Sequence, residues 1–210
     1  MYELPPTDVK VTSKNPHPYS FSLLVNIKWT IKRIVNSSIL DVKISNFLTE
    51  NFSKTKVCLN LGSGCWTPYD SVIRRKSRSL INLDATFLAL VFHPLTGKKL
   101  LVTDQNIYEL LKNNKITSIV SFHTLPFIHF NLPNLLIYCF ENYISFLSDI
   151  SFQPEADDVS SYFCRNKRSL LIEALEKTNA LIYDVSSEND YIQIIASRMA
   201  LIGRYLIVIH

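Results

Sequence analysis

Short apolar segments recur along the chain and alternate with stretches that are helical or irregular. Each segment is β-branched or leucine-rich on both faces, as is typical of strands covered by helices on either side. Alternation of this kind favours a parallel sheet joined by right-handed crossovers. We therefore predict an α/β fold, a doubly wound and mostly parallel sheet, whose first strands are residues 57–61, 79–84, 100–103 and 117–121.

The ends of the chain complete this outline. Residues 1–18 hold four of the nine prolines and predict an extended N-terminal arm. A helical extension over 19–55 then precedes a core over 56–210, and we predict a single domain for 19–210. The later elements that the pattern predicts are helices at 132–142 and 167–179 and strands at 143–152, 180–186 and 204–210, while 191–201 stays open between helix and strand.

Composition narrows the class of protein. Hydrophobic residues make up 47% and charged residues 19% of the 210, which is typical of an ordered globular protein. The most apolar region, 116–140, is interrupted by histidine, asparagine and proline, so we expect no membrane association. The N-terminus lacks the features of a signal peptide, and a soluble, cytoplasmic protein is predicted.

Charge and cysteine give two further expectations. The net charge is +4, and basic residues cluster at 74–78 and 165–168, which suits either a polyanionic partner or a solvated face. The four cysteines form no CxxC pair, so we expect reduced, buried thiols. No histidines stand beside them at ligand spacing, and no metal is expected.

The strand at 57–61 ends in Gly62-Ser63-Gly64, and the next strand ends in Asp84. In open parallel sheets, ligands bind beyond the carboxyl ends of the strands. A tight glycine turn followed, about twenty residues later, by a carboxylate is typical of a nucleotide site in which the acid binds a ribose diol. The ligand is therefore expected to carry a free ribose.

Two phosphate-binding alternatives fit poorly. A dinucleotide site needs a third glycine so that the following helix packs closely, and Thr67 stands at that position, followed by Pro68. A P-loop needs a Gly-Lys-Ser/Thr sequence, which does not follow. A nucleoside without phosphates fits best, and S-adenosylmethionine is the common one.

The chain resembles the class I S-adenosylmethionine-dependent methyltransferases over about residues 57–130. "LNLGSG", "INLD", "LLVTDQN" and "SIVSFHTL" are similar to their first four strand-end motifs. The resemblance implies a Rossmann-like fold and S-adenosylmethionine, the small-molecule methyl donor, as cofactor. It differs at Asn60, where the family usually has an acid. The cofactor-binding residues that it implies are Asn60, Gly62, Ser63 and Gly64 near the methionine, Asp84 at the ribose, Asp104 and Gln105 at the adenine, and Ser121 after the fourth strand.

The fourth-strand motif bears on the acceptor. Methyltransferases acting on amino groups of bases carry Asn/Asp-Pro-Pro-aromatic there, and cap ribose 2′-O-methyltransferases use a Lys-Asp-Lys-Glu set; "SFHTLPF" matches neither. Guanine N7 has an available lone pair and needs only alignment with the methyl group, not a general base. No catalytic side chain is then required, although His123 follows the strand end and stays a candidate.

"SFHTLPFIHF" and "NIKWTIKR" are distantly similar to mRNA cap guanine-N7 methyltransferases. This resemblance implies capped RNA as substrate and Lys32 near the methionine carboxylate. A compact, nidovirus-like viral enzyme, with viral replication proteins as partners in the host cytoplasm, would account for the small size. Residues predicted to bind substrate are Trp66, Tyr69, Phe122, His123, Phe127, Arg74 and Arg75, although the aromatic rings also suit a core.

Three functions remain open from the sequence. The first is the RNA methyltransferase, with guanine N7 preferred. The second is a cap ribose 2′-O-methyltransferase or an enzyme that methylates a small molecule or protein. The third is a non-catalytic, RNA-binding subunit with a methyltransferase-like fold, which would bind RNA with a steep salt dependence and no cofactor.

Overall fold

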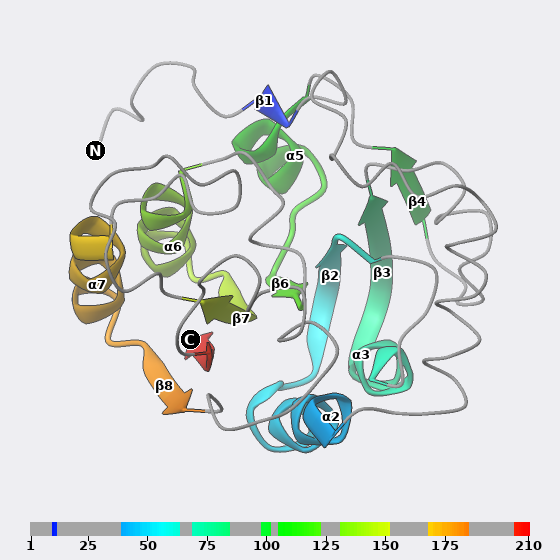
Figure 1. The fold of residues 1–210 in the computed structure, drawn as a ribbon. Helices are drawn as coiled ribbons and strands as arrows, with labels where there is room; N and C mark the ends of the chain where they lie inside the picture. The colour runs from blue at the N-terminus through cyan, green and yellow to red at the C-terminus, as the bar shows by residue number, and fades with distance from the viewer. Residues whose placement is uncertain are drawn as a thin grey trace, which may run out of the picture.

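A seven-stranded sheet forms the centre of the protein (Figure 1). The strand order is β4-β3-β2-β6-β7-β9-β8. The predicted Rossmann-like α/β fold is thereby confirmed. The structure is a computed structural model, and the residues that it describes are 10–11, 39–63, 69–84, 98–101, 105–122, 131–151, 168–184 and 204–210.

Five of the seven strands run parallel. Along the chain they are β2 (Thr55–Leu61), β3 (Ser77–Asp84), β4 (Lys98–Leu101), β6 (Ser118–Ser121) and β7 (Ser145–Ser151). All five were predicted from their apolar runs, with each end within two residues of the predicted one. A continuous apolar run is required because both faces of such a strand are buried.

The last two strands close one edge of the sheet. β9 (Arg204–Ile209) lies between β7 and β8 (Leu181–Asp184) and is antiparallel to both. The sequence predicted both strands but not this insertion, because an antiparallel partner has the same local pattern. A separate two-residue ladder pairs β1 (Lys10–Val11) of the predicted extended arm with β5 (Gln105–Asn106).

Helices cover both faces of the sheet (Figure 1). α2 (Ile39–Asn51) and α3 (Asp70–Lys76) contribute to one apolar cluster, and α5 (Ile107–Asn113), α6 (Leu132–Glu141) and α7 (Arg168–Lys177) to the other. α2 lies within the predicted helical extension 19–55, of which residues 19–38 lie outside the described part. α6 and α7 confirm two predicted helices.

The ends of α6 show why the sequence gives a helix there. The side chain of Asn131 accepts a hydrogen bond from the backbone N–H of Asn134, 3.1 Å away, and Pro133 occupies the first turn. Both features are typical of a helix start. The chain leaves the helix through Tyr143, whose φ is 54°, so the strand predicted from 143 begins only at Ser145.

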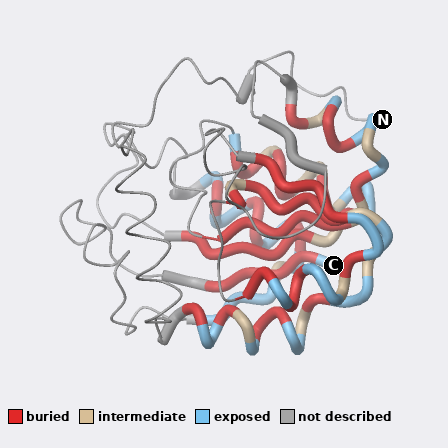
Figure 2. The backbone as a smooth tube through the Cα atoms, turned by 90° about the vertical axis from the view of Figure 1, so that its right-hand side faces the viewer, coloured by how far each residue is buried: buried red, intermediate tan, exposed pale blue. Residues whose placement is uncertain are grey.

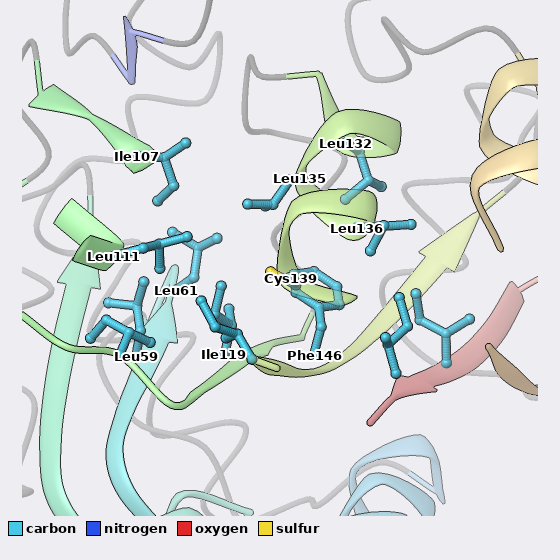
Figure 3. Packing of buried hydrophobic residues seen from close by; sticks show 14 of the residues in the cluster. Leu59, Leu61, Ile107, Leu111, Ile119, Leu132, Leu135, Leu136, Cys139 and Phe146 are labelled. Atoms are coloured by element: carbon cyan, nitrogen blue, oxygen red, sulfur yellow. The ribbon is translucent and has the colours of Figure 1, made fainter. Parts of the chain in front are cut away.

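Successive side chains of each strand point to opposite faces of the sheet, so the core has two parts, one on each face. Leu59, Leu61 and Ile119 point toward α5 and α6, whose leucines pack on them (Figure 3). Cys58, Leu80 and Val120 point to the opposite face, where α2 and α3 cover them. The strands are accordingly buried along most of their length, and exposed positions gather on the helices (Figure 2).

The prediction of reduced, buried thiols is confirmed for the two cysteines that the structure describes. Cys58 and Cys139 are free and fully buried, whereas Cys65 and Cys164 lie outside the described residues. In the part of the chain described, no helix has both the length and the apolarity needed to cross a membrane.

Candidate functional site

The sheet has a topological switch point beside β2. From β2 the chain proceeds through β3 to β4 in one direction, and then returns to β6 on the other side of β2. Crossovers that leave in opposite directions open a crevice at the carboxyl ends of the two strands. The glycine turn follows β2 at this point, so it lies where the sequence predicts a ligand.

Gly62 shapes the turn. Its φ is 70°, a left-handed value that costs glycine little and other residues more. The backbone N–H groups of Gly62 and Ser63 both donate to the carbonyl oxygen of Leu83, at 2.7 and 3.2 Å. The turn is therefore anchored to β3 one residue before that strand ends at Asp84.

The end of β6 is tied to β2 and β7. The hydroxyl of Ser121 donates to the carbonyl oxygen of Leu61 at 3.1 Å, and the hydroxyl of Ser148 donates to the carbonyl oxygen of Ser121. Both serines are fully buried. The Ser121 hydroxyl thus holds two strand ends together, which is a structural role beside the predicted cofactor contact.

A polar network lies beneath the turn, on the α2–α3 side of the sheet. Nδ2 of Asn60 donates to Oδ1 of Asp70 and to Oδ1 of Asn82, each at 3.2 Å. The exposed fractions of the three side chains are 4%, 1% and 0%. Because both contacts use the amide nitrogen, the planar amide presents its oxygen in another direction, as a hydrogen-bond acceptor.

Among the described residues, two buried polar atoms at the site lack a hydrogen-bond partner. They are Oγ of Ser63, whose residue is 3% exposed, and Nδ2 of Asn82. An unsatisfied buried polar group costs about 1–3 kcal/mol, so such atoms in a native fold call for an explanation. A polar ligand seated against the turn would supply the missing partners, which fits a nucleoside carrying an amino acid.

For two further predicted cofactor residues, Asp84 and Gln105, the structure gives the position of the backbone. Asp84 is the last residue of β3 and pairs with Leu101 of β4. Gln105 begins β5, whose partner is β1. Asp84 therefore lies at the carboxyl edge of the sheet, one residue after Leu83, which anchors the glycine turn.

Two of the predicted substrate aromatics lie in the core. Tyr69 and Phe122 are each 4% exposed, and their ring centroids are 5.3 Å apart in an edge-to-face arrangement. Phe122 also packs on Phe47 of α2, at 6.3 Å. In this conformation the two rings stabilise the α2–α3 side of the sheet, and stacking on a base would require them to move.

The basic residues of α3 lie away from the turn. Arg74 and Arg75 are exposed in its last turn, directly before β3 begins at the amino end of the sheet. Lys76 donates to the carbonyl oxygens of Leu48 and Thr49, at 2.9 and 2.6 Å, and so caps the end of α2. Burial lowers its pKa, and the nearby charge of Arg75 lowers it further.

Six predicted site residues lie outside the described part of the chain: Lys32, Gly64, Trp66, Asp104, His123 and Phe127. Within the described part, no group of three or more histidine, cysteine or carboxylate side chains could hold a metal ion.

Sequence reasoning missed two residues of the site, Asp70 and Asn82. Asn82 lies beside Asn60 because the register of β2 and β3 pairs Leu61 with Leu83, a relationship that neither strand shows by itself. Asp70 gave little signal, because it begins a seven-residue helix too short to show a helical period.

Comparisons with known proteins agree with this geometry. No family model matches the sequence, and no curated protein matches it. Solved structures do match in three dimensions. Geranyl diphosphate C-methyltransferase from Streptomyces coelicolor A3(2), in complex with Mg²⁺, geranyl diphosphate and S-adenosyl-L-homocysteine, superposes with a TM-score of 0.53 and 10% identity, over 80% of this chain and 76% of that chain.

Two more solved structures match the fold of this chain. One described as a putative S-adenosylmethionine-dependent methyltransferase from Listeria monocytogenes gives a TM-score of 0.53 at 11% identity, over 80% of this chain and 96% of that one. The [4+2]-cyclase SpnF gives 0.55 at 10% identity, over 80% of each chain. The protein thus has the class I methyltransferase fold, and the solved structures that share this fold carry out more than one reaction.

Proposed function

We propose that the protein is an S-adenosylmethionine-dependent methyltransferase that acts on RNA, with guanine N7 of the mRNA cap as the preferred acceptor. The observation that supports the cofactor is the glycine turn at the switch point, anchored to β3 beside Asp84. Oγ of Ser63 in the turn and Nδ2 of Asn82 beneath it have no hydrogen-bond partner among the described residues. When bound, the cofactor supplies a methyl group activated by the sulfonium charge.

The roles of the side chains follow from their chemistry. The amide oxygen of Asn60 and the hydroxyl of Ser63 can accept hydrogen bonds from an ammonium group, and Nδ2 of Asn82 can donate to a carboxylate. Asp84 accepts from the ribose diol. Gly64, Asp104, Gln105, Ser121 and Lys32 complete the cofactor contacts that the resemblance implies.

Transfer to guanine N7 suits a site without a general base. With the cofactor bound, the N7 lone pair would accept its methyl group, and the cofactor would be left as a neutral thioether. No proton moves in this step. Catalysis then depends on holding the acceptor in line with the methyl group, a task for Trp66, Phe127 and His123.

Binding of S-adenosylhomocysteine, measured by isothermal titration calorimetry, tests the cofactor assignment. We expect binding by the wild type and its loss in Asp84→Ala, because the ribose loses its acceptor. Lys112→Gln, an exposed change on α5, is the matched control and should retain affinity. No heat with the wild type, or near-normal affinity in Asp84→Ala, would contradict the proposal.

The acceptor is tested separately. Incubation with GpppA-capped RNA and methyl-labelled cofactor, followed by nuclease digestion of the product, distinguishes N7-methylguanosine from a 2′-O-methylated nucleotide. We expect label on the guanine. Label on the ribose would shift the assignment to a 2′-O-methyltransferase.

A small molecule is the second candidate acceptor. The supporting observation is the matched structure with geranyl diphosphate, a substrate far smaller than RNA. In that case cofactor binding would be retained while capped RNA received no label.

A further inference from the structure

Five exposed cations gather at the amino end of the sheet, on the face that α2 and α3 cover. They form what we call the basic patch: Lys54, Lys56, Arg74, Arg75 and Arg78. Lys54 lies between α2 and β2, and Arg74 and Arg75 end α3. In Figure 1 the ends of these elements meet at the start of β2 and β3, opposite the arrowheads.

Strand register brings two of these cations together. Thr55 pairs with Ser77 and Val57 with Ser79, so Lys56 and Arg78 lie side by side between these pairs. Residues two apart along a strand share a face, and the next positions, Cys58 and Leu80, belong to the cluster under α2 and α3. Lys56 and Arg78 therefore flank the end of α3, where Arg74 and Arg75 lie.

No described acidic side chain forms an ion pair with the basic patch. None of its five side chains forms an ion pair or a side-chain hydrogen bond with another described residue. The repulsion extends to the neighbouring Lys76, whose pKa Arg75 helps to lower. Like charges held close together cost free energy, and a polyanion removes that cost.

We propose that the basic patch binds the phosphate backbone of single-stranded RNA, as a docking surface for substrate that is separate from the site of methyl transfer. The proposal rests on the RNA substrate put forward above. The patch lies at the amino end of β2 and the glycine turn at its carboxyl end. Six residue steps of about 3.3 Å separate these ends by about 20 Å.

That separation sets a length for the RNA. At about 3.4 Å per stacked nucleotide, about six nucleotides are needed to reach from the patch to the turn. A tetranucleotide can occupy one place or the other. A dodecanucleotide can occupy both, so it should bind more tightly and depend on the patch.

The test measures binding of fluorescein-labelled single-stranded RNAs of four and twelve nucleotides by fluorescence anisotropy between 50 and 200 mM NaCl. In Arg74→Gln/Arg75→Gln, two phosphate contacts are lost. We expect the slope of log K against log salt to fall by about 1.4, which is about 25-fold in affinity at 100 mM salt. The tetranucleotide should show a smaller change than the dodecanucleotide.

Lys112→Gln/Lys177→Gln is the matched control. It removes the same charge from α5 and α7, which cover the opposite face. It should leave the slope unchanged. Equal affinity and slope in the two variants, or no binding of the dodecanucleotide by the wild type, would overturn the docking surface.

Titration with S-adenosylhomocysteine separates this proposal from the proposed function. The patch variant should keep wild-type cofactor affinity, because the turn lies at the other end of the sheet. A wild type that binds RNA through the patch but not S-adenosylhomocysteine would refute the methyltransferase and leave the surface standing. Methyl transfer by the wild type, together with RNA binding that does not change in the patch variant, would refute the docking surface and leave the methyltransferase standing.

Discussion

Asn60 on β2 donates a hydrogen bond to the carboxylate of Asp70 at the start of α3, over 3.2 Å. Class I methyltransferases usually have an acid at the position of Asn60, and this contact gives a physical reason for the difference. Two carboxylates buried at this distance cannot both be ionised without a large cost. An amide at position 60 instead supplies the hydrogen that Asp70 accepts.

A charge-exchange experiment tests this relationship. Asn60→Asp should lower the free energy of unfolding at pH 7 by about 3 kcal/mol, because it buries a second carboxylate against Asp70. Asn60→Asp/Asp70→Asn restores one amide and one acid and should recover most of the loss. Urea denaturation measures all three proteins. A double variant no more stable than Asn60→Asp would show that the contact does not govern stability.

Two variants of the glycine turn test its contributions to stability and to cofactor binding separately. Gly62→Ala places a Cβ at a φ of 70° and should cost about 1–2 kcal/mol, which is about 2–8 °C in Tm. Ser63→Ala removes a buried hydroxyl that has no hydrogen-bond partner in the described part of the chain, so stability should be unchanged or slightly increased. Its affinity for S-adenosylhomocysteine should nevertheless fall about tenfold. Unchanged affinity in Ser63→Ala would show that this hydroxyl does not meet the ligand.

Lys76 joins α3 to the end of α2. Lys76→Met keeps the aliphatic stem but removes the donors to the carbonyl oxygens of Leu48 and Thr49, so thermal unfolding should show a loss of about 1 kcal/mol. Arg75→Gln is the control, since it removes a neighbouring charge that disfavours the Lys76 ammonium. It should leave stability equal or slightly higher. An equal loss in both variants would point to a general effect of charge.

Alkaline pH should weaken the fold through Cys58. Burial, partly offset by hydrogen bonds to Ser118 and Ser77, raises the pKa of this thiol from 9.0 to about 11. The folded state holds the proton more tightly, so the contribution is complete below pH 9 and is lost as the pH rises to 11. Two pKa units correspond to about 2.7 kcal/mol.

Cys58→Ala isolates that contribution. The variant should be less stable at pH 7, because a buried group is lost, but its stability should fall less steeply between pH 9 and 11 than that of the wild type. Urea denaturation across this pH range measures both slopes. Parallel slopes would show that the Cys58 thiol has the same pKa in the folded and the unfolded protein.

The sequence alone determined the framework of the fold. Runs such as Val57–Leu61 and Ser79–Leu83 are apolar on both faces, and only a strand buried on both sides requires that. The glycine turn and Asp84 were predictable for a similar reason. A tight turn after a strand and an acid at the next strand end are local features, and parallel pairing places them at the same edge.

Only the tertiary structure decided which distant residues meet. One network joins Asn60 to Asp70, 10 residues later in the chain, and to Asn82, 22 residues later. The burial of Tyr69 and Phe122 was decided in the same way, because a ring has the same sequence signature in a core and in a binding site. Such contacts depend on the register of strands and the seating of helices, which arise from packing between elements and leave no periodic trace within any one of them.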